Sequence, residues 1–564
     1  MTRLLPRLVK SEGRIRHLMG YLALLIAPPL VVLLVIATKF HGLESNTAID
    51  FAQLARNISA GNGFTTDLVR PLSLVFRADL SHHPDLYNAP VYPQILAFFF
   101  GIVHPGERVI AAVGGLAWIV TVWLTYVVAL LWFGRRVAVI ATLFWGLNVA
   151  GLTAATEGLP GPVMTIPVLL AAWLALARPD DQKQETGNDI PAWRVVLVGL
   201  ACAIAFLTHY GLIAITIVLG AILIIRSQRK WRTLGVFGVG FLAPVVPWFL
   251  ENARSGAGGL GLYWYETMTG TATYPGDSVW RTLSEPPAPL VFLLEHPAQM
   301  TRKLIVGLGA FRLESFRWLD PFVLFLFVAV MWFSLSGSHR RRAAQVVAVS
   351  MVLGVIGSCL LRPDPSLLLA WAPLVGILGA AYFDDWVMQH INRSEAETVA
   401  IPVDITSTIH KRRRRKGDAV SVLFWRRLGV RAGMVALVAF PLIGFLGLGR
   451  PSSGLAVQSW AMELSRVLPA GARVMTDQPA AVAWYGHRTA LMLCQHESEL
   501  DQLERLFGPV EAMAVTPAIM HFSPQERGDW WQWIASPRGV YRGLAPAREM
   551  PANTLLRIRP EEPS

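Results

Sequence analysis

The stretch ERVIAAVGGLAWIVTVWLTYVVALLWF, residues 107–133, decides the fold class of this chain. A helix needs about 20 mostly apolar residues to cross the hydrocarbon core of a bilayer, and this run exceeds that length. The basic triplet GRR, residues 134–136, follows it directly. Basic residues just after an apolar run are typical of the cytoplasmic end of a transmembrane helix. The sequence therefore predicts a membrane-spanning helix here.

The composition of the whole chain also indicates a membrane protein. Hydrophobic residues make up 53% of the 564 residues, charged residues only 16%, and the mean hydropathy is +0.45. A soluble protein needs a more polar shell than this. The formal net charge of +12 would suit nucleic acid, but Lys and Arg gather at the ends of apolar runs. That distribution indicates topology signals, and we expect membrane lipids and no nucleic acid as partners.

Further apolar runs predict about eleven transmembrane helices in all. They lie near residues 18–40, 107–133, 137–155, 160–177, 195–209, 211–225, 233–250, 319–336, 343–361, 366–382 and 431–449. The basic breaks alternate with polar ones, so that each falls on the predicted inner side. We expect a multi-pass protein of the bacterial inner membrane, with the N-terminus inside and the C-terminus outside.

The same pattern divides the chain into two domains. Residues 1–450 form a multi-span domain with outer loops 41–106 and 251–303 and an inner linker 383–430. In residues 451–564, the segments ARVMTD, TALML and VEAMAVTP read as strands, and ESELDQLERLFG and ERGDWWQWIAS read as helices. The expected fold class is therefore an α-helical polytopic membrane protein with a small C-terminal α/β domain outside the membrane.

The first outer loop contains an amphipathic helix that begins near Ala48. Its apolar stripe consists of Phe51, Leu54, Ala55 and Ile58, and its opposite, polar face consists of Asp50, Gln53 and Asn57. We expect Asp50 in the first turn, exposed beside the membrane. An interfacial helix with an acid that favours the helix dipole explains the pattern equally well without any chemistry.

Three segments carry a family resemblance. They are residues 44–94, with DFAQLARN, GNGF and HPDLYNAPVYP, residues 263–276, with WYE and TYPG, and, more weakly, residues 473–491. This pattern resembles the bacterial GT-C glycosyltransferases, which include relatives of the protein O-mannosyltransferases and of the lipid A aminoarabinose transferase. The resemblance implies an inside N-terminus, a long first outer loop that carries a catalytic acid, and a C-terminal domain outside the membrane.

One departure from the family concerns the catalytic acid. Many relatives carry adjacent Asp and Glu ahead of the aromatic residue, whereas Thr47 and Ala48 stand at those positions here. The acid is then Asp50, directly before Phe51, with Glu44 as a weaker candidate. An inactive scaffold of the same fold is an alternative that this departure favours.

The implied reaction transfers a sugar from a polyprenyl-phosphate donor to a lipid, glycan or protein acceptor. A carboxylate takes the proton of the attacking hydroxyl, and cations stabilise the charge that develops on the leaving phosphate. The candidates for phosphate or lipid binding are Arg56, Arg70, Arg302 and Lys303. The candidates for substrate binding are His82, His83, Asp85, Tyr87, Glu157, His209, Tyr210, Trp264, Glu266 and Tyr274.

Several of these residues have simpler interpretations. Arg302 and Lys303 precede an apolar run and are equally suited to anchoring in lipid headgroups. Trp264 fits the aromatic belt of a membrane protein. Adjacent His82 and His83 are weak indications of a metal site, so a divalent metal stays open.

Two other functions are alternatives to the transfer of a single sugar. A ligase-type enzyme would deliver a preassembled glycan instead of one sugar. A lipid-linked glycan transporter or flippase predicts broken helices, ionisable residues at mid-membrane and repeated halves. The polar residues here lie mainly at the outer edge and no repeat is evident, which favours the transferase.

Overall fold

The computed structural model describes most of the helical part of the chain and much of the C-terminal part. The described residues are 25–80, 82–176, 190–332, 338–399, 429–430, 432–447, 453–469, 471–530, 544–546 and 555–558. The basic N-terminus, the segment DDQKQETGND and the block KRRRRK lie outside the described residues. The inner side that the sequence assigns to these three segments therefore stays a prediction.

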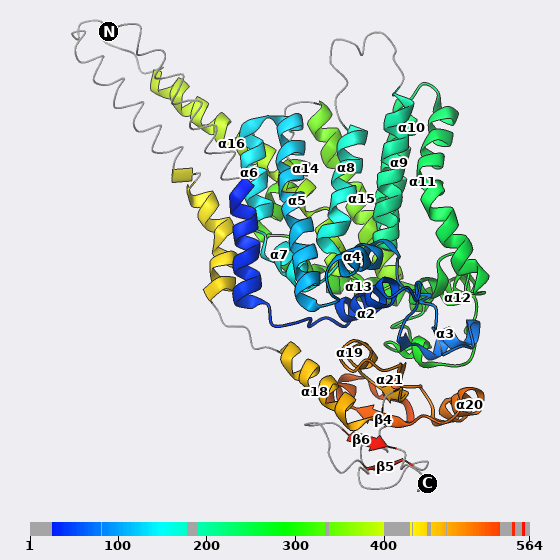
Figure 1. Cartoon of the computed structure of the whole chain (residues 1–564). Coiled ribbons are helices and arrows are strands. Elements are labelled where there is room, and N and C mark those ends of the chain that lie inside the picture. The colour runs from blue at the N-terminus through cyan, green and yellow to red at the C-terminus, as the bar shows by residue number, and fades with distance from the viewer. Residues whose placement is uncertain are drawn as a thin grey trace, which may run out of the picture.

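Helices make up most of the described chain. The bundle consists of α5 (Glu107–Phe133), α6 (Arg135–Gly146), α7 (Val149–Thr156), α8 (Gly161–Leu176), α9 (Ala192–Thr208), α10 (Ile213–Arg226), α11 (Lys230–Arg254), α13 (Pro297–Trp318), α14 (Pro321–Trp332), α15 (Ser338–Leu360) and α16 (Ala372–Val399). Two further helices, Leu25–Lys39 and Ala432–Gly447, run side by side along one edge of the bundle (Figure 1). The apolar runs of the sequence thus correspond to helices.

The long loops and the C-terminal part gather at one end of the bundle, which we call the loop end (Figure 1). Its short helices are α2 (Asn46–Ser59), α3 (Pro71–Phe76), α4 (Val91–Ile102) and α12 (Pro289–Glu295), with the 3-10 turns η2 (Tyr210–Leu212), η3 (Gly261–Thr267), η4 (Ser278–Arg281) and η5 (Pro365–Ala370). The turn between α5 and α6 lies at the opposite end. Gly134 makes that turn with a φ of +86°, a conformation that glycine adopts most readily.

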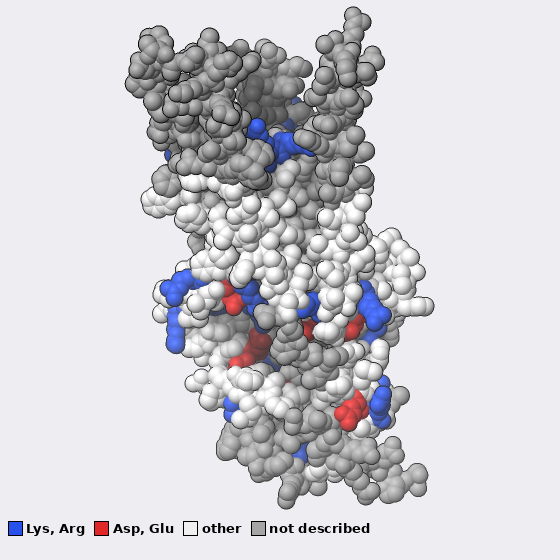
Figure 2. All heavy atoms as spheres, turned by 90° about the vertical axis from the view of Figure 1, so that its left-hand side faces the viewer, with Lys and Arg blue, Asp and Glu red and all other residues white. Residues whose placement is uncertain are grey.

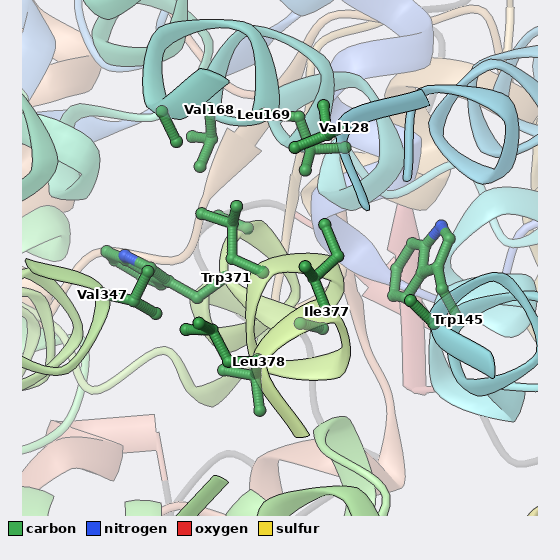
Figure 3. Packing of buried hydrophobic residues seen from close by; sticks show 14 of the residues in the cluster. Val128, Trp145, Val168, Leu169, Val347, Trp371, Ile377 and Leu378 are labelled. Carbon is green, nitrogen blue, oxygen red and sulfur yellow. The ribbon is translucent and has the colours of Figure 1, made fainter. Parts of the chain in front are cut away.

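A large apolar core holds the bundle together. Trp145, Val168, Trp371 and Leu378 belong to it and come from α6, α8, the end of η5 and α16 (Figure 3). The indoles of Trp145 and Trp371 donate hydrogen bonds to Thr121 and Ser350, at 2.7 and 2.9 Å. Buried indole nitrogens need such partners, so these bonds fix where α6 and α16 pack.

By length and composition, three helices qualify as membrane spans: α5, α11 and most of α15. Two bent pairs raise the number to five: α6 with α7, at 53°, and α13 with α14, at 113°. The number eleven stays a prediction, because the remaining described apolar helices are shorter than a full span. The described surface supports a membrane setting, since an uncharged zone lies above a belt of mixed charges (Figure 2).

The C-terminal part is an α/β unit built on a six-stranded sheet with the order β1-β3-β2-β4-β6-β5. The strands are β1 (Leu68–Val69), β2 (Val474–Thr476), β3 (Ala490–Met492), β4 (Ala512–Val515), β5 (Ala545–Pro546) and β6 (Leu555–Ile558). The first four are parallel, and β6 runs antiparallel to β4 and β5. The helices are α18 (Ser453–Val467), α19 (Pro479–Tyr485), α20 (Glu497–Phe507) and α21 (Pro524–Arg527), with the 3-10 turns η6 (Pro517–His521) and η7 (Gly528–Trp530).

Two features differ from the sequence prediction. The sheet takes its edge strand β1 from the first long loop, so the α/β unit includes chain from outside residues 451–564. The predicted helix ERGDWWQWIAS is wrong as far as the structure describes it, because only α21 and η7 form there. Gly528 explains the break, since its φ of +64° ends α21 after four residues.

Candidate active site at the loop end

Asp50 lies on α2, and its carboxylate is buried. The exposure that the sequence predicted for it is wrong, because the side chain is only 8% exposed. The cover comes from the chain after α2, where Thr66 accepts a bond from Gln53 Nε2 at 2.8 Å and the Asp67 amide donates to Gln53 Oε1 at 2.9 Å. The polar face of α2 therefore packs against its own loop instead of water.

Three donors surround the Asp50 carboxylate. Arg70 Nη2 lies 2.7 Å from Oδ2 and forms an ion pair with it. Asn88 Nδ2 donates to the same oxygen at 3.1 Å, and Gln53 Nε2 donates to Oδ1 at 2.9 Å. Oδ1 therefore has one donor and Oδ2 has two, which leaves acceptor capacity on Oδ1.

Asp85 is a second buried carboxyl group beside Asp50. Its Oδ1 accepts the backbone N–H groups of Tyr87 and Asn88, at 2.7 and 2.8 Å. Asn88 Nδ2 also donates to Asp85 Oδ2 at 2.8 Å, so one amide bridges the two carboxyl groups. Burial and the charge of Asp50 raise the pKa of Asp85.

Arg70 connects this pair to the second long loop. It stands directly after β1, as the N-cap of α3, and its guanidinium carbon lies 4.4 Å from the centre of the Tyr87 ring. The Tyr87 hydroxyl donates to Glu266 Oε1 at 2.5 Å. Burial, helped by the charge of Glu266, raises the pKa of Tyr87 well above its ordinary value, so the hydroxyl stays protonated and acts as a donor.

Glu266 is fully buried, and its carboxylate pairs with the guanidinium of Arg362. Thr269 Oγ1 donates to its Oε2 at 2.9 Å, and Arg362 Nη1 lies 3.5 Å from its Oε1. The same Arg362 nitrogen lies 3.5 Å from Asp277 Oδ1, and its side chain is 50% exposed. We call the connected side chains Asp50, Arg70, Tyr87, Glu266 and Arg362 the loop-end network.

A second polar pair joins His209, between α9 and η2, to Asp364, which lies in the same loop as Arg362. His209 Nε2 lies 3.2 Å from Asp364 Oδ2. Burial acts against ionisation of Asp364, but the hydrogen bonds from His209 and Ser366 prevail and lower its pKa. Tyr210, next to His209, accepts a bond from Trp248 Nε1 at 2.7 Å.

The sequence analysis missed Arg362 and Asp364. A signal for them exists in the segment RPDP, residues 362–365, a short charged break between two apolar runs. Ionisable residues in so short a connection between apolar runs favour a functional interpretation.

Arg56 and Lys303 make bonds within the chain. Arg56 donates to Asp67 at 3.0 Å and to the carbonyl oxygens of Ala483 and Trp484, at 2.8 and 2.9 Å. Lys303 is buried and donates to the carbonyl oxygens of Glu266 and Thr267. Each cation thereby holds a segment of the loop end in place.

The other residues singled out from the sequence lie apart from the network. Glu44 and His82 are exposed, and so is Arg302. His83 is buried, with its ring nitrogens 2.6 Å from the Asp79 carbonyl oxygen and 2.7 Å from Ser73 Oγ. Glu157 caps α7, Trp264 is 40% exposed, and the Tyr274 ring packs against Phe292. Within the described residues, no group of three or more His, Cys, Asp or Glu side chains is arranged to hold a metal ion.

Comparisons with known proteins show which family model and which solved structures this chain is similar to. Residues 82–250 match the model of a family described as dolichyl-phosphate-mannose-protein mannosyltransferase. The crystal structure of ArnT from Cupriavidus metallidurans bound to undecaprenyl phosphate matches 97% of this chain and 99% of its own, with a TM-score of 0.57 and 15% identity. The chain therefore shares the fold of this ArnT structure.

The partial family match and the shared fold make the chain similar to the protein O-mannosyltransferase and ArnT type. Two structures from Archaeoglobus fulgidus share the fold. The oligosaccharyltransferase AglB in complex with an inhibitory peptide and a dolichol-phosphate matches with a TM-score of 0.50 and 12% identity, and the oligosaccharyltransferase tethered with an acceptor peptide matches with 0.52 and 11%. Each match covers 88% of this chain and 69% of the other. No curated protein matches the chain.

Proposed function

We propose that this membrane protein is a GT-C glycosyltransferase that transfers a sugar from a polyprenyl-phosphate donor to an acceptor on the extracytoplasmic face of the bacterial inner membrane, with Asp50 as the general base. The observation that carries the proposal is the loop-end network, in which a buried carboxylate is connected to a half-exposed arginine. The family whose model matches is named for a polyprenyl-type lipid donor, and the ArnT structure binds undecaprenyl phosphate. Both support the donor class.

The two ends of the network have different roles in the reaction: Asp50 accepts the proton, and Arg362 stabilises the leaving phosphate. The acceptor hydroxyl binds at Asp50 Oδ1, which has the fewer partners, and its proton passes to that carboxylate as the oxygen attacks the anomeric carbon. The bond from this carbon to the phosphate oxygen breaks, and polyprenyl phosphate leaves with the electron pair. Arg362, and behind it Arg70, stabilises the negative charge of the leaving phosphate.

Arg70 also keeps Asp50 suited to its role. An ionised carboxylate that is largely removed from water needs a cation and hydrogen-bond donors, and Arg70, Asn88 and Gln53 supply these. Of the predicted substrate contacts, Asp85 shares Asn88 with Asp50, and His209 pairs with Asp364, two residues from Arg362, so these two are available for the substrate.

The transporter alternative is less favoured. The two bent helix pairs are the kind of break that it predicts. Yet the ionisable residues of the network come from loops and helix ends at one end of the bundle (Figure 1). A carrier needs them at the middle of the membrane.

Transfer in reconstituted vesicles tests the proposal. The purified protein is supplied with polyprenyl-phosphate sugars labelled in the sugar, and the label is followed into an extractable acceptor. Wild type is compared with Asp50→Asn and with Asp501→Asn, a matched substitution on the exposed side of α20. We expect transfer by wild type and Asp501→Asn and at least a 100-fold loss in Asp50→Asn, the lower end of what general-base removal costs. Movement of intact labelled lipid across the vesicle without transfer would instead establish the transporter.

A further inference from the structure

We propose that the C-terminal α/β unit sets the place of Arg70, the cationic partner of Asp50, and that Arg56 is the positioning residue that couples the two. The part of this inference that concerns the rate of transfer rests on the proposed transfer reaction. It assigns the unit a role in assembling the site, whichever acceptor is used.

The connection begins with β1. This strand has only two residues, Leu68 and Val69, and it pairs in parallel with Ala490 and Leu491 of β3. The Ala490 amide donates to the Asp67 carbonyl oxygen at 2.8 Å. So short a strand has no stable place of its own, and its register is set by the partner strand.

Arg70 follows β1 with no intervening residue. A slip of one residue along β3 would move it by about 3.3 Å and turn its side chain to the other face of the sheet. Arg70 Nη2 lies only 2.7 Å from Asp50 Oδ2, so a slip of this size would break the ion pair. The register of β1 against β3 therefore decides whether Asp50 has its cation.

Arg56 connects α2 directly to the α/β unit through hydrogen bonds. It lies on the same helix as Asp50, and it donates both to Asp67, the residue before β1, and to two carbonyl oxygens at the end of α19. Its guanidinium carbon also lies 5.1 Å from the centre of the Trp484 ring. One side chain thus holds together the helix of the base, the strand of its partner and the unit that sets the register.

The second long loop is attached to the same unit. Arg281, 1% exposed, donates to the carbonyl oxygens of Leu493 and Cys494 just after β3, at 2.7 and 3.0 Å. Carboxyl ends of parallel strands are where α/β domains usually bind ligands, and here a loop of the chain itself occupies that position. The Asp277 amide donates to Glu526 Oε1 at 3.1 Å, while the Asp277 carboxylate faces Arg362. Both arginines of the network therefore depend on contacts with the unit.

A double-mutant cycle separates positioning from general stabilisation. Transfer is measured for wild type, Arg56→Gln, Arg70→Gln and the double variant, with Arg254→Gln as the control, because Arg254 is 76% exposed and pairs only within its own helix. We expect Arg56→Gln to lower kcat about 10-fold with KM changed less than about 2-fold, a coupling typical of residues in one hydrogen-bond network, here through Asp67, Gln53 and Asp50. In the Arg70→Gln background it should lower kcat less than about 2-fold, since the partner that it positions is gone. Equal factors in both backgrounds would overturn the proposal.

Hydrogen exchange supplies a readout that needs no activity. In the intact protein, Arg56→Gln should speed exchange in peptides that cover residues 66–72, and Arg254→Gln should leave them unchanged. Unchanged exchange in Arg56→Gln would refute the coupling. Should Arg56→Gln not fold, Arg56→Lys serves instead, because it keeps the charge and loses the planar fork that reaches several acceptors at once. If wild type transfers no sugar from any donor, the proposed function fails, while the exchange result still decides the coupling.

Discussion

Replacing Arg362 by Gln removes the more exposed of the two network arginines, 50% exposed against 13% for Arg70. If Arg362 stabilises the leaving phosphate, its charge acts mainly in the transition state. Losing one preorganised donor of this kind costs about 10²- to 10³-fold in kcat, which corresponds to about 2.7–4 kcal/mol. We expect a loss of this size with a smaller change in KM.

The stability cost of the same change should be lower. Arg362 makes two ion pairs, each at 3.5 Å and each partly in contact with solvent, and such pairs contribute about 0–1 kcal/mol apiece. Glu266 keeps its bonds from Tyr87 and Thr269, so it is not left without partners. The free energy of unfolding should therefore fall by about 0–2 kcal/mol, less than the activation free energy rises.

The assay is steady-state transfer in proteoliposomes, with thermal unfolding measured on the same preparations. Arg362→Lys should lie between wild type and Arg362→Gln, because lysine keeps the charge but not the bidentate fork. Arg254→Gln controls for the loss of an exposed arginine at the end of α11. A kcat for Arg362→Gln within about threefold of wild type would refute the role of this residue at the phosphate, since transition-state stabilisation cannot be lost at so small a cost.

Three other predictions follow from the same contacts. Burial raises the pKa of Asp477 to about 6, so the folded state holds this proton more tightly than the unfolded chain does. Stability should therefore fall as the pH rises from about 4 to 6. Asp477→Asn should flatten that slope in thermal unfolding, and an unchanged slope would contradict the prediction. Lys303→Met leaves the Thr267 carbonyl oxygen without its lysine donor, whereas the Glu266 carbonyl oxygen keeps the bond from Thr269 Oγ1. Stability should fall by about 1–3 kcal/mol, measured by the unfolding midpoint, and a midpoint equal to wild type would show that the bonds are not needed. Glu44 is exposed, and the three native cysteines are buried. Glu44→Cys should therefore react with a membrane-impermeant maleimide added from the extracytoplasmic side. Labelling only from the cytosolic side would show the opposite topology.

Local pattern was enough to predict most helices of the bundle, but not α13, which begins inside the predicted outer loop 251–303. The run at residues 107–133 coincides with α5, because a continuous apolar segment followed by a glycine has few structural alternatives in a membrane. The breaks within α6–α7 and α13–α14 were not predicted. They depend on capping at single residues, such as Asn148, which accepts from the Gly151 amide, and Asp320, which accepts from the amides at the start of α14.

The site was predictable only in part, and for a physical reason. Helical periodicity correctly put Asp50 and Gln53 on one polar face, but it said nothing of what covers that face. The cover comes from tertiary contacts, as does β1, whose partner strand β3 lies more than 400 residues further along the chain. Arg362 was missed because a lone arginine between two apolar runs resembles a topology signal until its carboxylate partners are seen.

The most direct test of the account is a single-turnover measurement on Asp50→Asn with the donor already bound. The variant keeps the shape of the side chain and loses the negative charge that accepts the proton. We predict that it binds the labelled polyprenyl-phosphate sugar within a few-fold of wild type and transfers it at least 100-fold more slowly. Transfer at the wild-type rate from the preloaded donor would show that Asp50 is not the base.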